Sequence, residues 1–326
     1  MLAKRLRHKI KYGIVLICAI ITILNYHFAP TERLVEKTNS TAVIMILYNR
    51  IPKCGSSLLN VLFEQLSSRT GAFIHIFGHS ESLYHRLSIE EQHNLTRDIR
   101  HHVYVHSPRP TVFLQHFHFL HVASTSNATF YYINQYRDPL ARTLSSFDFR
   151  RFGCTVSRSQ HQCLMIHPSL RNLTMDECVS TGDPSRCITH PYGVRSPIPY
   201  FCGHLSICDD SLTRPTSDTA LALAKTNIER YFIHVGLLEY LESSLRLLEH
   251  IQPSIFTGLL DAYVNGSNRR IVNRVPKKYR HNINNRTRNI LLKLLKPEYE
   301  LYNFIRARFI DHYTRVFHQA PIYQES

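Results

Sequence analysis

Runs of apolar residues along the chain alternate between short strand-like segments and longer segments with helical spacing. Apolar, β-branched and aromatic residues predict buried strands over 43–48, 130–135 and 231–238. Partial alternation predicts a further strand over 111–122. Apolar positions at helical spacing predict helices over 58–68, 217–230, 239–250 and 298–318. This order predicts an α/β fold, a mostly parallel sheet flanked by helices.

The loop between the first strand and the first helix has the features of an anion-binding loop. Asn49–Ser57 contains Lys53, Cys54, Gly55 and the paired serines Ser56 and Ser57, and Gly71 is expected to end the helix. Backbone N–H groups and the positive dipole end at a helix N-terminus attract anions. The loop is not a Walker A motif, because Gly-x₄-Gly-Lys-Ser/Thr is absent. Taken alone, it also fits an ordinary capped helix after a strand.

A second strand-to-helix junction has similar features. Asp138 is expected to cap a helix that Pro139 opens, directly after Arg137. Arg137 can bind a phosphate in bidentate fashion, and Ser145 lies about two turns into the helix. Because open α/β sheets bind ligands at the carboxyl ends of their strands, the two junctions predict two anion sites. The donor 3′-phosphoadenosine 5′-phosphosulfate (PAPS) has two such anionic ends, its 5′-phosphosulfate and its 3′-phosphate.

The composition favours an anionic partner. The 326 residues include 39 Lys+Arg against 24 Asp+Glu, a formal net charge of +15, and 44% are hydrophobic. That is enough for one large α/β domain with a sizeable core. Nucleic acid, phosphate and sulfated polysaccharide would all suit the charge, so the compartment has to decide between them.

The N-terminus predicts a membrane anchor. Residues 1–11 are basic and residues 12–28 are largely apolar, a length at the short end for a membrane span. A cleaved signal peptide would need a small-x-small site, which this run lacks. We therefore expect an uncleaved signal anchor with its basic end in the cytoplasm and a span suited to a thin early-secretory bilayer. Residues 29–42 would form a stem and 43–326 a lumenal domain.

Two further features favour a lumenal setting. Six of the eight cysteines fall between Cys154 and Cys208, which predicts a disulfide-stapled segment in an oxidising compartment. Zinc is disfavoured, since none of these pairs has Cys-x₂-Cys spacing. There are also six glycosylation sequons, at Asn39, Asn94, Asn127, Asn172, Asn265 and Asn285. A lumenal protein has no nucleic acid to bind.

The motifs and their order resemble those of the glycosaminoglycan 2-O-sulfotransferases. The matching segments are Tyr48–Ser56, Ile133–Ser145 with Phe149–Gly153, Asp176–Cys178, Ile198–His204 and Val235–Glu242. The similarity extends from about Val43 to Phe317, and residues 165–171 favour the uronyl branch of the family. It implies a P-loop-like, PAPS-dependent sulfotransferase fold in a type II Golgi membrane enzyme that needs no metal. The acceptor would be a uronic acid 2-hydroxyl, in dermatan or chondroitin sulfate first and heparan sulfate second. The heparan sulfate relatives imply a homotrimer.

The resemblance also assigns roles to residues. The catalytic base would be His116, in Gln115–Leu120, and the transition-state charge would be held by Lys53. The 5′-phosphosulfate would be bound by Lys53, Cys54, Gly55, Ser56 and Ser57, and the 3′-phosphate by Arg137 and Ser145. From its position after the first strand, Arg50 is expected to contact the acidic groups of the acceptor, and His118 is expected to contact the acceptor as well. In a strand, His116 and His118 would share one face. A basic loop over 265–288, with Arg269, Arg270, Arg274, Lys277 and Lys278, would close over the donor. Gln115 departs from the uronyl branch, where a basic residue stands.

The resemblance implies disulfides Cys178–Cys187 and Cys202–Cys208, and we extend it to a third pair, Cys154–Cys163. Cys54 is expected to be a small, packed free thiol. A metal site at His116, His118 and His121 would lack a nearby carboxylate. Two other classes of protein compete with a sulfotransferase. A non-catalytic lumenal lectin would use the basic surface to hold sulfated chains, and a lumenal kinase would need a Walker-type lysine or an Asp-x-Asp motif, neither of which we find.

Overall fold

The computed structural model describes residues 42–76, 83, 85–106, 109–152, 173–189, 195–208, 217–266 and 282–324. The predicted cytoplasmic tail, anchor and nearly all of the stem lie outside these ranges. So do Asn39, Asn172, the Cys154–Cys163 pair and the five basic residues of 269–278. Within the described ranges, no helix combines the length and the apolar character needed to cross a bilayer.

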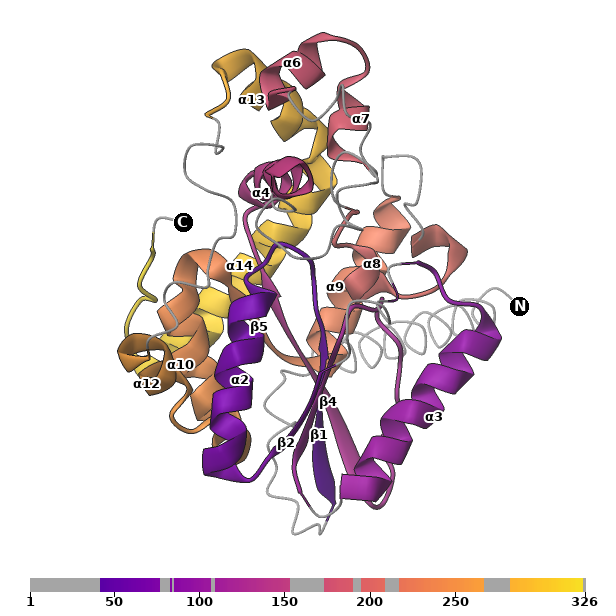
Figure 1. The fold of residues 1–326 in the computed structure, drawn as a ribbon, viewed down its shortest axis with the longest axis vertical. Coiled ribbons are helices and arrows are strands. Elements are labelled where there is room, and N and C mark those ends of the chain that lie inside the picture. Colours follow the sequence, from indigo (N-terminus) through magenta and orange to yellow (C-terminus); the bar gives the residue numbers. More distant parts are fainter. Residues whose placement is uncertain are drawn as a thin grey trace, which may run out of the picture. The chain divides into compact units, whose positions relative to one another are not determined.

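The centre of the fold is a five-stranded, all-parallel sheet in the order β2-β3-β1-β4-β5 (Figure 1). Its strands are β1 (Val43–Asn49), β2 (Phe73–Ile76), β3 (Thr111–Gln115), β4 (Ala128–Tyr136) and β5 (Phe232–Leu237). This confirms the α/β prediction and the strands expected at 43–48, 130–135 and 231–238. Because parallel strands need crossover connections, helices separate β1 from β2, β2 from β3 and β4 from β5 along the chain, while residues 116–127 connect β3 to β4 without a helix.

The helices near the sheet are α2 (Ser56–Thr70), α3 (Ile89–His106), α4 (Pro139–Phe152), α8 (Pro199–Cys202), α9 (Asp218–Tyr231), α10 (Leu241–Ile251), α11 (Pro253–Phe256), α12 (Leu259–Asn265) and α14 (Lys296–Phe317). The others are α6 (Met175–Ser180), α7 (Pro184–Ile188), α13 (Asn285–Leu294) and the 3₁₀ turns η5 (Ser206–Cys208) and η6 (Leu238–Tyr240). The four helices predicted at 58–68, 217–230, 239–250 and 298–318 are present as α2, α9, α10 and α14.

Each face of the sheet has its own core. On one face, Ile46 and Tyr48 of β1 pack with α2, α10, α11 and α12. On the other, Met45 and Leu47 pack with α3, α8, α9 and α14. The alternation along β1 therefore separates two apolar layers, as expected for a strand buried on both sides. Figure 1 shows α2 and α10 on one side of the sheet and α3 and α9 on the other.

A third, smaller apolar cluster lies away from the sheet. It joins α4, α6, α7 and α13 through Phe147, Val179, Cys187 and Leu291, all of them buried. These four helices lie together at the top of Figure 1, beyond the carboxyl ends of the strands. Because α4 belongs to this cluster and also begins at the end of β4, it links the cluster to the edge where ligands are expected.

Two predicted segments were wrong in extent. The strand over 111–122 ends at Gln115, because the next backbone groups pair outside the sheet: the His116 carbonyl accepts from Leu83 N–H at 2.7 Å, and Phe119 N–H donates to Pro199 at 3.2 Å. The loop expected over 265–288 contains the start of α13, since Asn284 caps that helix by accepting from Thr287 N–H at 2.8 Å.

Candidate active site

Four strands end side by side at one edge of the sheet. The parallel registers pair Asn49 with Gln115 and Tyr136 with Leu237, while Tyr48 pairs with Ile133. The loops that follow β1, β3, β4 and β5 therefore begin at one edge. These loops contain Lys53, His116 and Arg137, so the two predicted anion sites and the predicted base share one edge, as predicted for an open α/β sheet.

Two buried asparagines hold this edge together. The Asn134 amide donates to the Asn49 carbonyl at 2.7 Å and to its side-chain oxygen at 2.9 Å. The Asn49 amide in turn donates to the Tyr200 carbonyl of α8 at 2.6 Å. Such a satisfied buried network fixes the relative positions of β1, β4 and α8. Neither asparagine was singled out in the sequence, where a polar residue at a strand end is a weak signal.

The loop after β1 adopts the conformation of an anion cradle. Lys53 and Gly55 both have left-handed backbones, with φ of 67° and 82°. A Cβ on Gly55 would lie 2.9 Å from Leu238 Cδ1, so glycine suits this position sterically as well as conformationally. No side chain caps α2, and the Gly55 carbonyl accepts from Leu58 N–H at 3.0 Å. The N–H groups of Ser56 and Ser57 therefore lie at the positive end of the helix dipole.

The side chains of this loop divide into two kinds. Cys54 is completely buried and is a free thiol, as predicted. Burial raises the pKa of the Cys54 thiol to about 12, against the opposing charges of Arg142 and Arg137. This position can thus offer an anion its backbone only. Lys53 is partly exposed, and its Nζ lies 3.8 Å from the ring centroid of Phe149 on α4.

The junction after β4 is organised around Asp138. Its Oδ1 accepts from Ala141 N–H at 2.8 Å, confirming the predicted cap, and its Oδ2 accepts from the Tyr299 hydroxyl at 2.9 Å. Its own N–H donates to Glu239 Oε1 at 2.9 Å. Arg137, partly exposed, therefore projects from a backbone fixed on both sides. Ser145 is partly exposed on α4, about two turns further on.

Arg142 is a functional neighbour that the sequence analysis missed. This fully buried side chain donates from Nε to the Pro52 carbonyl at 3.1 Å and from Nη2 to the Arg195 carbonyl at 2.6 Å. Its Nη1 lies 3.6 Å from Glu298 Oε2 of α14 in a buried ion pair. Arg142 thus connects α4 to three other parts of the chain. These are the Lys53 loop, the segment that precedes α8, and the α14 helix. In the sequence, nothing near Arg142 distinguishes it from an arginine on the surface of a helix.

His116 lies at the end of β3 and is 5% exposed. Its Nδ1 is 2.7 Å from the Arg50 carbonyl. A carbonyl only accepts, so the neutral imidazole carries its proton on Nδ1 and its basic lone pair on Nε2. This is the tautomer that a general base requires, oriented by the backbone of the same loop that contains Lys53.

His118 does not share a strand face with His116, as was predicted, because β3 ends at Gln115, before both histidines. All five residues from His116 to Leu120 are buried. The His118 ring lies 5.4 Å from the rings of both Tyr200 and His204, and Leu87 N–H donates to His204 Nδ1 at 3.0 Å. Burial lowers the pKa of His118 to about 3 and that of His204 to about 4. Both imidazoles are therefore neutral near pH 7.

Arg50 and Gln115 are both buried beside the base. The Asn60 amide, with its nitrogen toward the Ser56 carbonyl, accepts from Arg50 Nη1 at 2.9 Å. The Gln115 carbonyl accepts from Arg50 N–H at 2.9 Å, continuing the β1–β3 pairing by one step. Gln115 also lines a cavity of about 460 Å³ whose wall includes Glu91 and Asp98. Two carboxylates make that cavity a poor site for a polyanion.

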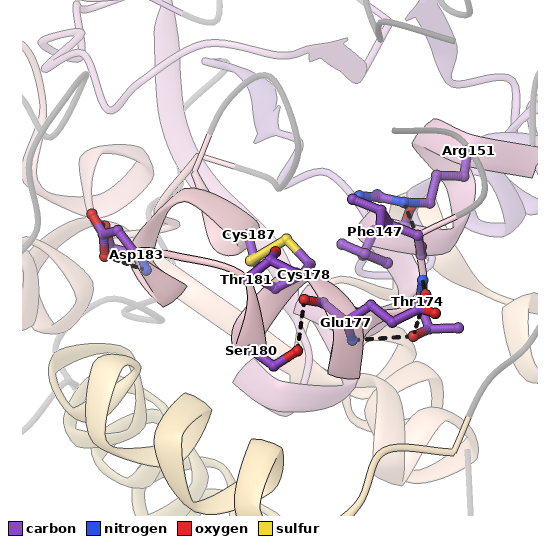
Figure 2. Close-up of a disulfide and its surroundings, with 11 residues drawn as sticks. Phe147, Arg151, Thr174, Glu177, Cys178, Ser180, Thr181, Asp183 and Cys187 are labelled. Atoms are coloured by element: carbon purple, nitrogen blue, oxygen red, sulfur yellow. Dashed lines mark hydrogen bonds between the residues drawn. A yellow bond between two sulfur atoms is a disulfide. The ribbon is translucent and has the colours of Figure 1, made fainter. Parts of the chain in front are cut away.

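Both implied disulfides are present among the described residues. Cys202–Cys208 closes the turn that carries His204, and Cys178–Cys187 joins α6 to α7. Figure 2 shows the second, with the capping box of α6 beside it: Thr174 N–H donates to Glu177 Oε2 at 2.7 Å. Asn94, Asn127, Asn265 and Asn285 are exposed, as glycosylation requires. In the described part of the chain, no group of His, Cys, Asp and Glu is arranged to hold a metal ion.

Together these features define an α/β protein with a cationic anion cradle and an oriented neutral imidazole at one sheet edge. No profile of a known protein family matches the chain. Individual proteins do match. Uronyl 2-sulfotransferase from mouse and from human are each 32% identical over 295 residues, covering 88% of this chain and 66% of theirs. A heparan sulfate 2-O-sulfotransferase of Caenorhabditis elegans is 29% identical over 93% of this chain and 89% of its own.

The chain belongs to the glycosaminoglycan 2-O-sulfotransferase family, which confirms the resemblance stated from its motifs. The named relatives are enzymes that act on glycosaminoglycans, so this membership does not favour a lectin. The chain spans about two thirds of the length of the uronyl relatives.

Proposed function

We propose that this protein transfers a sulfonyl group from PAPS to the 2-hydroxyl of a uronic acid in a glycosaminoglycan, with dermatan or chondroitin sulfate as the preferred chain. Heparan sulfate is the second candidate. The observation that carries the proposal is the contact of His116 Nδ1 with the Arg50 carbonyl at 2.7 Å. It orients an imidazole base with the backbone of the loop that also contains Lys53. The preference for dermatan or chondroitin rests on the uronyl relatives.

In this proposal, His116 Nε2 accepts the proton of the acceptor hydroxyl as that oxygen forms its bond to sulfur. The bond from sulfur to the 5′-phosphate oxygen breaks at the same centre, and the electron pair leaves with the phosphate. Lys53 and the N–H groups of Ser56 and Ser57 stabilise the negative charge that builds up there. The transfer changes no oxidation state and requires no oxidant, and it is proposed to proceed without a metal ion.

Residues at the second junction would hold the other end of the donor. PAPS supplies the sulfonyl group, and its 3′-phosphate would be bound by Arg137 and Ser145. The fit is supported by the fixed backbone on both sides of Arg137, where Tyr136 pairs with Leu237 of β5 and Asp138 caps α4. Cys54 and Gly55 would contribute backbone N–H groups, which suits the buried Cys54 side chain and the positive φ of Gly55.

For the acceptor, we propose Arg50 and His118 as contacts. His118 lies two residues from the base, and its Nδ1 is buried without a hydrogen-bond partner among the described residues. A buried polar atom in this condition is stabilised when a ligand hydroxyl reaches it. Arg50, His116 and His118 are all at most 5% exposed, so acceptor binding would require neighbouring side chains to move aside.

We also propose that the enzyme is a type II Golgi membrane protein that functions as a homotrimer. Support comes from the basic residues 1–11, the apolar residues 12–28 and the four exposed sequons of the described residues. The cysteine pairs Cys178–Cys187 and Cys202–Cys208 fit an oxidising lumen.

The test is transfer of radiolabelled sulfonyl groups from PAPS to a panel of desulfated dermatan, chondroitin and heparan chains, followed by disaccharide analysis. We expect 2-O-sulfated uronic acid, formed fastest on dermatan or chondroitin. Sulfate on any other position would contradict the proposal. Heparin binding with no thermal shift on 3′-phosphoadenosine 5′-phosphate (PAP), and no transfer, would support the lectin instead.

A further inference from the structure

The α4 helix contacts the Lys53 loop in two places, at the backbone directly before Lys53 and at the Lys53 ammonium. At the backbone, Arg142 Nε donates to the Pro52 carbonyl at 3.1 Å, directly before Lys53. At the ammonium, Lys53 Nζ lies 3.8 Å from the centroid of the Phe149 ring. Arg142 and Phe149 are seven residues apart, and Ser145 lies between them. This spacing puts all three on one side of the helix.

Lys53 needs such support because its own conformation is unfavourable. A left-handed backbone, with φ of 67°, is uncommon outside glycine and persists where the surroundings hold it. A lysine side chain also has much rotamer freedom to lose when its ammonium is fixed at one point. An aromatic face attracts the ammonium through the ring quadrupole and thus limits that freedom without neutralising the charge.

We propose that Phe149 is a positioning residue that acts through Lys53, holding its ammonium where charge develops during transfer. This inference rests on the proposed function. A lysine placed in advance stabilises the transition state without reorganisation at the moment of reaction. Loss of the ring should therefore lower kcat. The affinity for PAP should change little, because Arg137, Ser145 and the N–H groups of Ser56 and Ser57 still bind its two phosphates when the Lys53 ammonium is held less firmly.

The same helix offers a matched control. Phe147 lies two residues away and also has a cation over its ring, with the Arg151 guanidinium carbon 3.1 Å from the centroid. It faces the cluster of α4, α6, α7 and α13, and Figure 2 shows it with Arg151 near the Cys178–Cys187 disulfide. Phe147 is buried, whereas Phe149 is partly exposed. Replacing Phe147 should destabilise the protein and leave the lysine in place.

The experiment compares Phe149→Leu, Phe149→Tyr and Phe147→Leu for kcat, KM and PAP affinity. Leucine keeps much of the apolar volume and removes the ring, so kcat should fall about tenfold while PAP affinity stays within about twofold. Tyrosine keeps the ring and should restore kcat to within about twofold. Phe147→Leu should lower Tm with little effect on kcat below its unfolding transition. If Phe149→Leu does not fold, Phe149→Met is judged by the same criteria.

The inference is overturned if Phe149→Leu keeps the wild-type kcat, if tyrosine and leucine lose activity equally, or if the loss appears only as weaker PAP binding. In each of these cases the unaltered enzyme still transfers sulfate, so the proposed function would stand. If the unaltered chain bound PAP and transferred nothing to any chain of the panel, the proposed function would fail and this inference with it.

Discussion

The donor loop (residues 50–57) and the segment that contains the base (residues 116–120) follow neighbouring strands, β1 and β3, but they are built by different means. In the donor loop, the backbone forms the site: two positive φ angles, an uncapped helix start and one partly exposed lysine. Around the base, side chains form the site. The residues from His116 to Leu120 are all buried, against a turn closed by the Cys202–Cys208 disulfide.

The donor loop and the segment that contains the base also differ in the charges around them. Cations gather behind the donor loop, where Arg137 and Arg142 both act on Cys54. The surroundings of the base hold neutral imidazoles, since burial lowers the pKa of His118 and His204. This division suits a transfer between a donor with two anionic ends and a hydroxyl: fixed positive charge where negative charge leaves, and an uncharged base where a proton is removed. If the division holds, substitutions and changes of pH should affect the two regions separately.

The largest effect should come from Arg142, because it joins the donor loop to Arg195 and to Glu298 of α14. Arg142→Gln leaves Glu298 buried without its cation and removes bonds to Pro52 and Arg195. We expect a loss of about 3–5 kcal/mol in the free energy of unfolding, measured in urea. The control is Arg246→Gln on α10, where an exposed guanidinium donates to the Tyr313 hydroxyl at 3.3 Å. Equal losses in the two variants would contradict the role of Arg142.

The two disulfides should separate stability from acceptor binding. Replacing both cysteines of Cys202–Cys208 or of Cys178–Cys187 by serine opens a loop of similar length, with sequence separations of 6 and 9. Each change should cost about 2–3 kcal/mol of stability. Only the first should raise the acceptor KM several-fold, with PAP affinity unchanged, because His204 lies in its turn. If both changes raised the acceptor KM alike, the turn would have no special relation to the acceptor.

Acid should destabilise the fold wherever a buried histidine is held neutral, and the surroundings of the base contain two such histidines. His118 and His204 have folded pKa values of about 3 and about 4, below the ordinary value of 6.5. Their contribution to stability is complete above pH 6.5 and is lost as the pH falls toward 4, by up to about 1.4 kcal/mol per pH unit for each histidine. His204→Asn should remove the uptake of about one proton on unfolding, and so reduce the slope of the free energy of unfolding against pH. Urea unfolding between pH 7 and 4.5 provides the measurement. The exposed His93→Asn serves as control, and an equal change there would contradict the assignment.

The smallest effect should be seen at Cys54. Although it lies inside the donor loop, its thiol is buried and its pKa is raised to about 12. The native protein should therefore leave Cys54 unmodified by iodoacetamide at pH 8 over a time in which the urea-unfolded chain reacts completely. Mass spectrometry of the Cys54 peptide provides the measurement. Labelling of the native protein at the rate of a free thiol would show that the loop opens.

The donor loop was predictable from sequence because its signals are local. A buried strand, a Lys–Gly–Ser loop and leucines at helical spacing all lie within residues 43–68, and the structure has β1 and α2 there. The same holds for Asp138 and Pro139 at the start of α4. Local chemistry specifies local backbone, and nothing distant overrides it in these two places.

The surroundings of the base were less predictable, because distant segments decide them. The end of β3 at Gln115 depends on backbone partners at Leu83 and Pro199, which no pattern within 111–122 reveals. The burial of Arg142 depends on Pro52, Arg195 and Glu298, which are far apart in the sequence. The helices α3 and α13 were missed because both sequences are polar on average and contain few apolar residues to indicate a buried face.

The central claim is that His116 removes the proton while other residues bind the donor, and His116→Ala tests it most directly. Transfer of sulfonyl groups from PAPS to desulfated dermatan should fall at least about a hundredfold, while the thermal shift on PAP stays at the wild-type value. The folded state is confirmed by that same shift. Activity within about threefold of wild type in His116→Ala would contradict the account.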